Sequence, residues 1–431
     1  MHTAEEAHRI LLDHLRHLED ELVPLVSAGG RVLARPVHRR MPQPPFTRSR
    51  VDGYAVSLSD LEAAEGPPLT VSGVVLAGEA PAGPLAAGSA LRVMAGAALP
   101  DGVGAVVPFE EVPQGDKAHV GDRVTLRRRP APGENVIPPG WEGPAGSLVL
   151  PAGMLCGPVE LGLLAAAGQE RVWVHRLPRV ALVATGSELV PVGEELPPGK
   201  IYASNLHLLS ELVRIWGGEP RPAQPVPDRP GAVREALEGQ AGSSDLLLVT
   251  GGVAGGDRDL SRRVLTELGW SLLVDGVDFH PGGRCAAAQV APEGPLAIFL
   301  SGGPGACLTA AALLAVPVLA ALSGRAWGRV EAALAESPEG TPSGVPSGRG
   351  RRRAVPVGLG LSGGRLWAYP QPHSSGAPII SSGTDGLILL PPGGGGEGGD
   401  AGFSTGPGSG GVVEVWPLTP NLPVGGVAGK K

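Results

Sequence analysis

The sequence predicts a multidomain protein of mixed α/β and β class, in which a β region, an α/β region and a second β region follow one another. Its 431 residues exceed what one typical domain holds. It contains 68 glycines and 46 prolines, a proportion typical of many turns and short strands. The spacing of the apolar residues changes near residues 45, 178 and 325, so we expect region boundaries there.

The N-terminal segment predicts a helix over residues 4–18. Thr3 and Glu6 have the spacing of a capping box, which marks a helix start. The apolar positions that follow lie on one helical face: Ile10, Leu11, Leu15 and Leu18. A second helical pattern, GPVELGLLAAAG, occupies residues 157–168.

Residues 45–144 predict a small β domain. Short apolar runs such as LTVSGVVLAG (69–78) and GAVVPFEEV (104–112) alternate with turns rich in Gly, Pro and Asp, without a helical period. The chain from 325 to 431 has the same texture, with runs such as GLILLPPG (386–393) and VVEVWPL (412–418). We expect its glycine-rich stretch, 393–411, to be a mobile loop.

The region from 178 to 324 predicts a doubly wound, mainly parallel sheet, because strand and helix patterns alternate there. The strand patterns lie at 180–185, 246–250 and 296–300, and the helix patterns at 205–216, 230–239, 259–268 and 306–322. Ligands of such sheets bind beyond the carboxyl ends of the strands. Three loops leave those ends, at 184–189, 250–259 and 301–306.

Charge, cysteine content and hydropathy indicate a soluble cytoplasmic protein. The net charge of −7 excludes a surface built to attract nucleic acid. Cys156, Cys285 and Cys307 lie far apart, so neither a disulfide framework nor a zinc site is predicted. The N-terminus lacks the features of a signal peptide, and no run of about 18 uninterrupted apolar residues predicts a membrane span.

The loop TGGVAGGDRD (250–259) suits an oxyanion. Its glycines allow backbone N–H groups to approach a ligand closely, and a helix start follows. Asp257 and Asp259 would repel an anion unless a cation such as Mg²⁺ lies between them. Alternatively, Asp259 is only the N-cap of the next helix, and this loop alone does not decide between the two.

Two further loops favour a binding site at the same edge of the sheet. Glu188 follows the first strand, where its carboxylate could face the same crevice as Asp259. The turn SGGP (301–304), with Pro304 near a helix start, would again favour an anion. Such a pocket fits phosphoryl or nucleotidyl transfer, in which positioning and a metal ion supply most of the catalysis.

Seven segments together resemble the MoeA/gephyrin family in order and spacing. They are PPFTRSRVDGYAV (44–56), RVMAGAALPDGVGAVVPFEEV (92–112), GENV (133–136), ATGSEL (184–189), GKIYASN (199–205), TGGVAGGDRD (250–259) and SSGTDGLILLP (381–391). The resemblance implies four domains: an elongated helical domain (1–44 and 145–177), an inserted β domain (45–144), a molybdopterin-binding α/β domain (178–324) and a C-terminal β-barrel (325–431).

The resemblance also implies an activity. Family members insert molybdenum from molybdate into adenylylated molybdopterin with Mg²⁺, and AMP is released. They are homodimers, in which the active site lies between the α/β domain of one subunit and the inserted β domain of the other. We therefore expect a homodimer, with molybdopterin adenylyltransferase and molybdoenzymes as transient partners.

The family's functional residues carry over to specific positions of this chain. The implied catalytic acids are Asp52, Glu188, Asp228 and Asp259, of which Glu188 and Asp259 would bind the metal. The implied substrate-binding residues are Ser187, Thr250, Gly251, Gly252, His280, Arg284, Gly302, Ser381 and Ser382.

The chain departs from the family where cations are expected. His280 and Gly283 stand in place of two lysines, and only Arg284 is nearby. Other departures are Ala95 for a threonine, Gly104 for an aspartate, Ile137 for an arginine and Glu142 for an aspartate. A histidine is mostly neutral near pH 7, so the pocket would bind anions less well. An alternative is therefore a catalytically impaired paralogue that carries molybdopterin or serves as a scaffold. A third reading is an unrelated Mg²⁺-dependent nucleotide-binding enzyme on the same scaffold.

Overall fold

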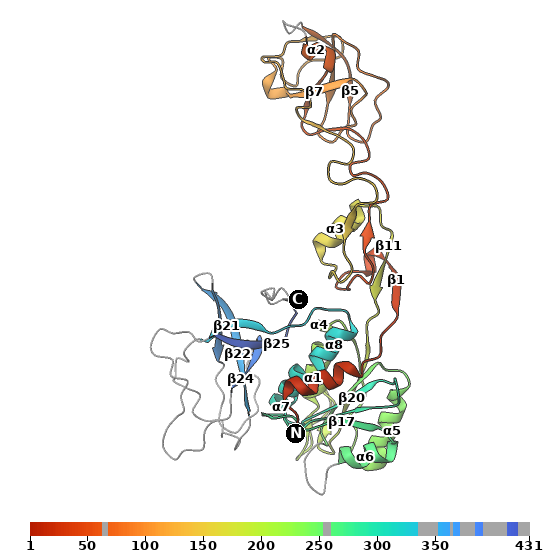
Figure 1. Cartoon of the computed structure of the whole chain (residues 1–431), viewed down its shortest axis with the longest axis vertical. Coiled ribbons are helices and arrows are strands. Elements are labelled where there is room, and N and C mark those ends of the chain that lie inside the picture. The colour runs from red at the N-terminus through yellow and green to blue at the C-terminus, as the bar shows by residue number, and fades with distance from the viewer. Residues whose placement is uncertain are drawn as a thin grey trace. The chain divides into compact units, whose positions relative to one another are not determined.

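The computed structural model describes residues 1–62, 68–252, 260–334, 352–362, 365–370, 384–390 and 412–420 (Figure 1). The chain divides into two compact units. The main unit comprises Met1–Val23, Gly30–Ala34 and Trp173–Lys431, and the inserted unit comprises Pro24–Gly29 and Arg35–Val172. The unit boundaries fall at the ends of Gly30–Ala34 and within β1 (Asp20–Pro24) and β11 (Arg171–His175).

The main unit contains a six-stranded sheet. Its order is β15 (Glu219–Pro222), β12 (Arg179–Ala184), β16 (Leu246–Thr250), β20 (Leu296–Leu300), β19 (Ala286–Gln289) and β17 (Ser271–Asp275). The first four strands are parallel, and β19 runs antiparallel to both of its neighbours. The mainly parallel sheet predicted from the alternating strand and helix patterns is confirmed.

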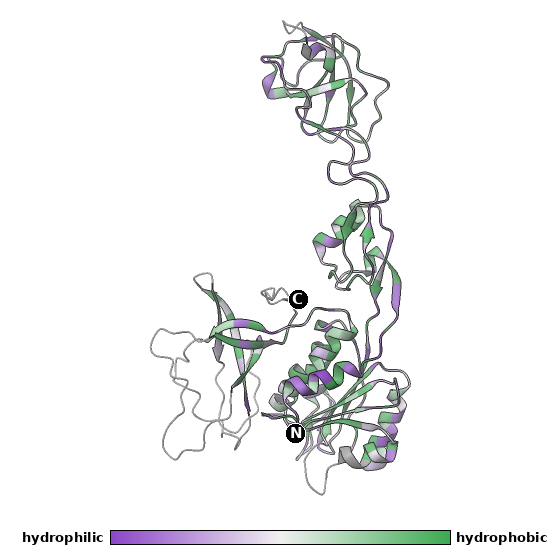
Figure 2. Cartoon of the chain, in the orientation of Figure 1, coloured by the Kyte–Doolittle hydropathy of each residue, from purple (hydrophilic) through white to green (hydrophobic). Residues whose placement is uncertain are grey.

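Helices cover both faces of this sheet (Figure 1). One face packs against α1 (Ala4–Asp13), α4 (Ser204–Ile215), α7 (Pro304–Ala310) and α8 (Val316–Leu322), and the other against α5 (Pro230–Ala241) and α6 (Leu260–Leu268). Strand β12 shows why: Leu182 points into the first core and Val183 into the second, and both are fully buried. Figure 2 shows that the strands of this sheet are mainly hydrophobic. Strands that are apolar on both faces are stable when helices cover both sides of the sheet.

Helix α1 begins as predicted and ends earlier. The side chains and backbones of Thr3 and Glu6 form a reciprocal capping box. The prediction of a helix to residue 18 is wrong, because the helix ends at Asp13. The ring Nδ1 of His14 donates to Ile10 O at 2.7 Å and so satisfies one of the carbonyl groups that a further turn would have bonded.

The last helical segment of the α/β region, Pro304–Leu322, is long and apolar enough to cross a membrane, with a mean hydropathy of 2.2. The helix predicted over residues 306–322 is confirmed, although its apolar run is interrupted by a threonine and a proline and so did not predict a membrane span. It consists of α7, a π-helical turn η3 (Ala311–Ala315) and α8. In its most apolar stretch 83% of the residues are buried inside the protein, as expected for a helix of the core.

The C-terminal strands close into a barrel. They are β21 (Val330–Leu334), β22 (Arg352–Ser362), β23 (Arg365–Pro370), β24 (Gly386–Leu390) and β25 (Val412–Pro417). The pairings run β22–β23–β21–β25–β24 and return from β24 to β22, which confirms the predicted barrel. The α/β region adds β18 (Phe279–His280) in parallel to the start of β22. The predicted loop at 393–411 lies outside the described residues.

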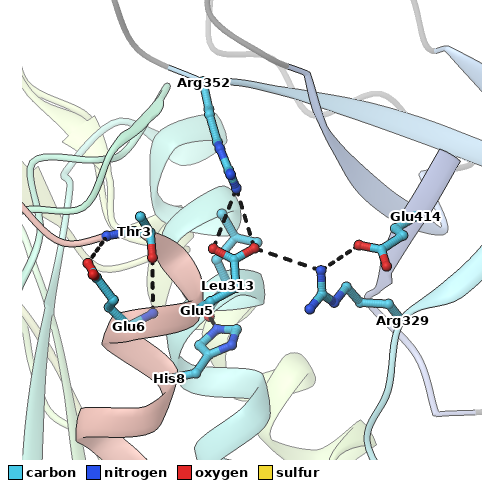
Figure 3. A network of polar contacts seen from close by, with 8 residues as sticks. All are labelled: Thr3, Glu5, Glu6, His8, Leu313, Arg329, Arg352 and Glu414. Atoms are coloured by element: carbon cyan, nitrogen blue, oxygen red, sulfur yellow. Dashed lines mark hydrogen bonds and ion pairs between the residues drawn. The ribbon is translucent and has the colours of Figure 1, made fainter.

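Helix α1 also contacts the barrel (Figure 3). The Glu5 carboxylate accepts hydrogen bonds from Arg352 Nη1 at 3.3 and 3.4 Å and lies 3.7 Å from Arg329 Nη1. One turn on, His8 is buried against the rings of Trp327 and Trp416, and its Nε2 donates to Leu313 O. Burial lowers the pKa of His8 below its ordinary value.

The inserted unit contains a five-stranded sheet. Its order is β7 (Val103–Pro108), β4 (Gly53–Ser57), β6 (Ser89–Val93), β5 (Leu69–Val75) and β8 (Arg123–Val124). Tyr54 and Val56 of β4 enter one core, and Ala55 enters another on the opposite face. The unit also holds η1 (Leu25–Ser27), the pair β2 (Val37–His38) and β10 (Leu148–Leu150), the pair β3 (Arg48–Ser49) and β9 (Val136–Ile137), α2 (Leu58–Glu62), η2 (Phe109–Glu111) and α3 (Pro158–Ala166).

Candidate functional site

A cavity of about 330 Å³ lies in the main unit, at the carboxyl ends of β12, β16 and β20. Its wall also includes β13 (Leu189–Val190) and β14 (Ile201–Tyr202) in part, and the start of α4. Seven of the predicted site residues line it: Glu188, Asp228, Thr250, Gly251, Gly252, Arg284 and Gly302. These residues come from five separate stretches of the sequence, and the parallel strands bring them together at one edge.

The turn after β16 is a glycine turn for two physical reasons. Gly251 and Gly252 have φ angles of 94° and 70°, which side chains other than glycine rarely adopt. In addition, a Cβ on Gly251 would lie 2.1 Å from Thr185 O. Gly251 N donates to Leu300 O at 3.1 Å, so the turn is fixed to the neighbouring strand.

The turn after β20 lies directly against the first one. A Cβ on Gly302 would be 3.6 Å from the Cα of Gly251. The Asn205 amide Nδ2 donates to Thr250 Oγ1 at 2.9 Å and to Gly302 O at 2.7 Å, and so joins the two turns. The structure thus forms a backbone cradle from two glycine turns. We call these turns the Thr250 turn (250–252) and the Ser301 turn (301–304).

Two carboxylates lie at the exposed side of the cavity. The carboxylate of Glu188 folds back over its own loop, where a Cβ on Gly186 would be 2.7 Å from Glu188 Oε1. Ser187, which does not line the cavity, accepts a hydrogen bond from Asp228 N on its Oγ at 3.2 Å. This bond ties the loop of Asp228 to that of Glu188. Carboxylate oxygens are the ligands that Mg²⁺ prefers.

Of the two basic residues predicted for the site, Arg284 lines this cavity and His280 does not. Of the described residues that line the cavity, Arg284 alone carries a positive charge. Its carbonyl oxygen accepts from Ser301 Oγ at 3.0 Å, which holds it beside the Ser301 turn. His280 is exposed on β18, paired to the barrel, and does not line the cavity. His280 was predicted to bind substrate, and its position outside the cavity wall does not support that prediction.

The other predicted residues lie elsewhere in the chain. Asp52 belongs to the inserted unit, where its Oδ1 accepts from Ala95 N at 2.6 Å. Asp259, Ser381 and Ser382 lie outside the described residues. Within the described ranges no three His, Cys, Asp or Glu side chains converge on one point, so the metal role predicted for Glu188 with Asp259 stays a prediction.

Neither Cys285 nor Cys307 lines this cavity, and both are buried. Burial raises the pKa of Cys307, which contacts Thr250 behind the wall, to about 12. Burial likewise raises the pKa of Cys285 to about 12. A thiolate is the nucleophilic form of cysteine, and burial disfavours that form for both thiols.

Sequence reasoning missed two buried polar residues of the wall. Asn205 and Thr185 are 8% and 4% exposed, and both line the cavity. Asn205 Oδ1 and Thr185 Oγ1 have no hydrogen-bond partner. The only signal for Asn205 was its place at the end of the GKIYASN segment, between a turn and a helix start.

A doubly wound α/β region with a glycine-lined cavity, an inserted β unit and a C-terminal barrel defines a protein of MoeA architecture. Residues 2–168 match the family described as "MoeA N-terminal region (domain I and II)". Residues 181–321 match "Probable molybdopterin binding domain", and residues 340–418 match "MoeA C-terminal region (domain IV)". The chain belongs to the MoeA family, as its sequence motifs indicated.

Individual relatives agree with this assignment. The chain is 35% identical over 314 residues to a molybdopterin molybdenumtransferase of a Nostoc species, covering 72% of this chain and 71% of the relative. It is 30% identical over 330 residues to the enzyme of that name from Haemophilus influenzae, covering 75% and 78%. A crystal structure of the molybdopterin biosynthesis MoeA protein from Pyrococcus horikoshii superposes with a TM-score of 0.76, at 31% identity and 97% and 99% coverage.

Proposed function

We propose that the protein is a molybdopterin molybdenumtransferase, which inserts molybdenum from molybdate into adenylylated molybdopterin and releases AMP. The observation that carries this proposal is the glycine cradle of the Thr250 and Ser301 turns, beside Glu188 and Asp228. Backbone turns without Cβ atoms admit a phosphate closely, and the carboxylates lie beside it. The relatives named for this activity match most of the chain.

Magnesium fits the donor set of this site. Two carboxylates and one guanidinium line the cavity among the described residues, so a phosphate and a molybdate would meet excess negative charge there. We propose that Glu188, together with Asp259, holds Mg²⁺. When bound, the ion would neutralise the phosphate oxygens and the developing charge on AMP.

The chain's own residues would orient the substrate. Arg284 supplies the cation of the cavity wall, and the backbone at Gly251 and Gly302 sets how closely a phosphate can approach. The apolar wall at Ile201 and the ring of Tyr202, whose hydroxyl donates to Glu194 O, would shield one side of the pterin from water.

A second candidate is a carrier of molybdopterin without insertase activity. The observation that favours it is the position of His280, which is exposed and outside the cavity wall where the family has a lysine. Arg284 then remains as the cation of the described wall for two anionic substrates.

One experiment separates the two candidates. Purified protein would be mixed with adenylylated molybdopterin, Mg²⁺ and molybdate, and AMP release followed together with reconstitution of a cofactor-free molybdoenzyme. We expect molybdate-dependent AMP release that is lost in Glu188→Gln and Asp259→Ala. Tight pterin binding without AMP release would establish the carrier instead, and no binding at all would refute both.

We propose that the protein is a cytoplasmic homodimer in which Asp52 of one subunit completes the cavity of the other, and that it meets molybdopterin adenylyltransferase and molybdoenzymes transiently. Complementation tests the arrangement. Asp52→Ala and Glu188→Gln are each expected to be inactive, and subunit exchange between them should restore activity, since one site of each mixed dimer is intact. Mixtures that stay inactive although dimers exchange would show that Asp52 acts within its own subunit, and an active Asp52→Ala variant would show that Asp52 is not required.

A further inference from the structure

The side chain of Asn205 has only one possible orientation. Gly302 O can only accept a hydrogen bond, so the atom 2.7 Å from it must be the amide nitrogen. Thr250 has a single hydroxyl proton, which it donates to Ser301 O at 3.1 Å, and its Oγ1 must therefore accept from Asn205 Nδ2 at 2.9 Å. Both amide protons of Asn205 are used, one on each turn.

The amide thus joins parts of the cavity that are distant in sequence. Asn205 stands at the start of α4, Thr250 at the end of β16 and Gly302 after β20. The second bond of Thr250, to Ser301 O, closes a ring between the two turns. Within the described wall, these side-chain bonds fix the spacing of the Thr250 turn and the Ser301 turn beyond what the bond from Gly251 N to Leu300 O provides.

This arrangement is a poor one for stability alone. Asn205 Oδ1 is left buried without a partner, as is Thr185 Oγ1, which would be 2.8 Å from a Cβ on Gly251. A buried acceptor without a donor is destabilising and offsets much of what the two amide hydrogen bonds contribute. Removal of the amide is therefore expected to change the free energy of unfolding little, while the spacing of the turns loses its constraint.

We infer that Asn205 is a positioning residue for the ligand cavity: its carboxamide sets the width of the glycine cradle that receives the phosphate of a molybdopterin-type ligand. The nature of the ligand rests on the proposed function, whereas the coupling of the two turns does not. Asn205 acts through the side chain of Thr250 and the backbone carbonyl of Gly302, and the orientation of its amide follows from these partners.

Three variants test this inference against a structural role. Asn205→Ala removes both hydrogen bonds. Asn205→Asp places a carboxylate oxygen against Gly302 O and adds a negative charge beside the phosphate. Ser210→Ala is the matched control, because Ser210 is a buried polar residue of the same helix, 7% exposed, whose Oγ donates to Leu206 O at 2.6 Å.

The variants would be compared in three measurements: the Kd of molybdopterin under anaerobic conditions, amide hydrogen exchange in the segments 250–252 and 300–304 of the free protein, and Tm. For Asn205→Ala we expect a Kd raised at least about tenfold. Exchange should be faster in both segments, and Tm should move by no more than about 3 °C. Asn205→Asp should bind more weakly than Asn205→Ala, and Ser210→Ala should behave as wild type.

The inference is overturned if Asn205→Ala binds and exchanges like wild type. It is also overturned if Tm falls in proportion to the loss of binding, with faster exchange throughout α4, since that pattern defines a purely structural residue. If the wild-type protein does not bind molybdopterin, the proposed function fails, and the exchange data alone decide whether Asn205 couples the two turns.

Discussion

Asp245 and Arg176 form a two-pronged ion pair, with Arg176 Nη1 2.9 Å from Oδ2 and Nη2 2.8 Å from Oδ1. The Asp245 side chain is 4% exposed and also accepts from Arg16 Nη2 and Arg179 N, each at 2.8 Å. This aspartate therefore ties the entry of β12 to β16 and to the segment after α1. Such fully bonded buried carboxylates are strongly coupled to their partners.

Asp245→Ala should lower the free energy of unfolding by about 2–4 kcal/mol, because it leaves the guanidinium of Arg176 and Arg179 N without their acceptor. Arg16→Ala is the control: the Arg16 side chain is 48% exposed, and its loss should cost about 0–1 kcal/mol. Urea unfolding measures both. Equal decreases in the free energy of unfolding for the two substitutions would contradict a larger stabilising role of Asp245.

The same aspartate gives a dependence on acid pH. Burial alone would raise the pKa of Asp245, but the hydrogen bonds from Arg176 and Arg179 N outweigh it and hold the pKa below 3.8. Because the folded-state pKa is depressed, its contribution to stability is present above pH 4 and is lost as pH falls below that value. Unfolding between pH 5 and pH 2.5 should show this loss in wild type and less of it in Asp245→Ala.

Protonation of His8 should cause a second loss of stability, at a higher pH than that of Asp245. Burial lowers the pKa of His8 below 6.5, whereas its hydrogen bond to Leu313 O and the charge of Glu5 oppose the shift. The folded state therefore favours the neutral ring, and its contribution is present above pH 6.5 and falls as pH drops through the folded-state pKa. His8→Gln should flatten the stability profile below pH 6.5. If the free energy of unfolding of His8→Gln depends on pH as in wild type, His8 does not cause this loss.

Gly251→Ala should disrupt the cavity more than an ordinary glycine substitution does. It introduces both an unfavourable φ angle of 94° and a Cβ 2.1 Å from Thr185 O. Gly269 is a matched control, with a φ of 68° and no atom within 4 Å of an added Cβ. We expect the free energy of unfolding to fall by about 1–2 kcal/mol in Gly269→Ala and by about 3 kcal/mol or more in Gly251→Ala. Denaturant unfolding checks both, and equal losses would show that the turn can move away from Thr185.

Arg284→Ala should weaken the binding of the anionic substrate about tenfold at low salt, because it removes the positive charge of the described cavity wall. The difference from wild type should shrink as ionic strength rises, since salt screens exposed charges. Arg214→Ala is the control, on the exposed face of α4, where its side chain is 59% exposed. Titration calorimetry at two salt concentrations measures the effect, and a loss that is independent of salt would indicate packing instead.

The sequence predicts the sheet and its binding edge well, because both follow from local patterns. Runs such as LLLVT are apolar on both faces, and the carboxyl ends of parallel strands meet at one edge, so the convergence of Glu188 and Thr250 could be expected. The order of a β region, an α/β region and a second β region also followed from local patterns, whereas the closure of the barrel came from the family resemblance. The role of Asn205 could not be predicted, since its partners lie 45 and 97 residues away and no periodicity reports them.

Sequence patterns also failed to predict where the first helix ends and where His280 lies. The apolar face of the first helix continues past Asp13, but a single contact from His14 to a backbone carbonyl ends the helix there. The motif placed His280 next to Arg284, and the structure separates them because residue 280 pairs with Arg353 of the barrel. A local side-chain contact accompanies the first case, whereas a distant partner, Arg353, decides the second.

The pairing of β18 with β22 connects the backbone of the barrel to the segment that leads into the cavity wall. His280 pairs with Arg353, and four residues later Arg284 reaches the cavity wall. A second connection is the hydrogen bond that the Trp216 indole donates to Leu418 O at 2.8 Å. A fragment cut after Leu322 would lose both at once and leave the support of Arg284 open to solvent. We therefore expect a chain shortened in this way to bind its ligand more weakly, because the segment that leads to Arg284 would lose its pairing with the barrel.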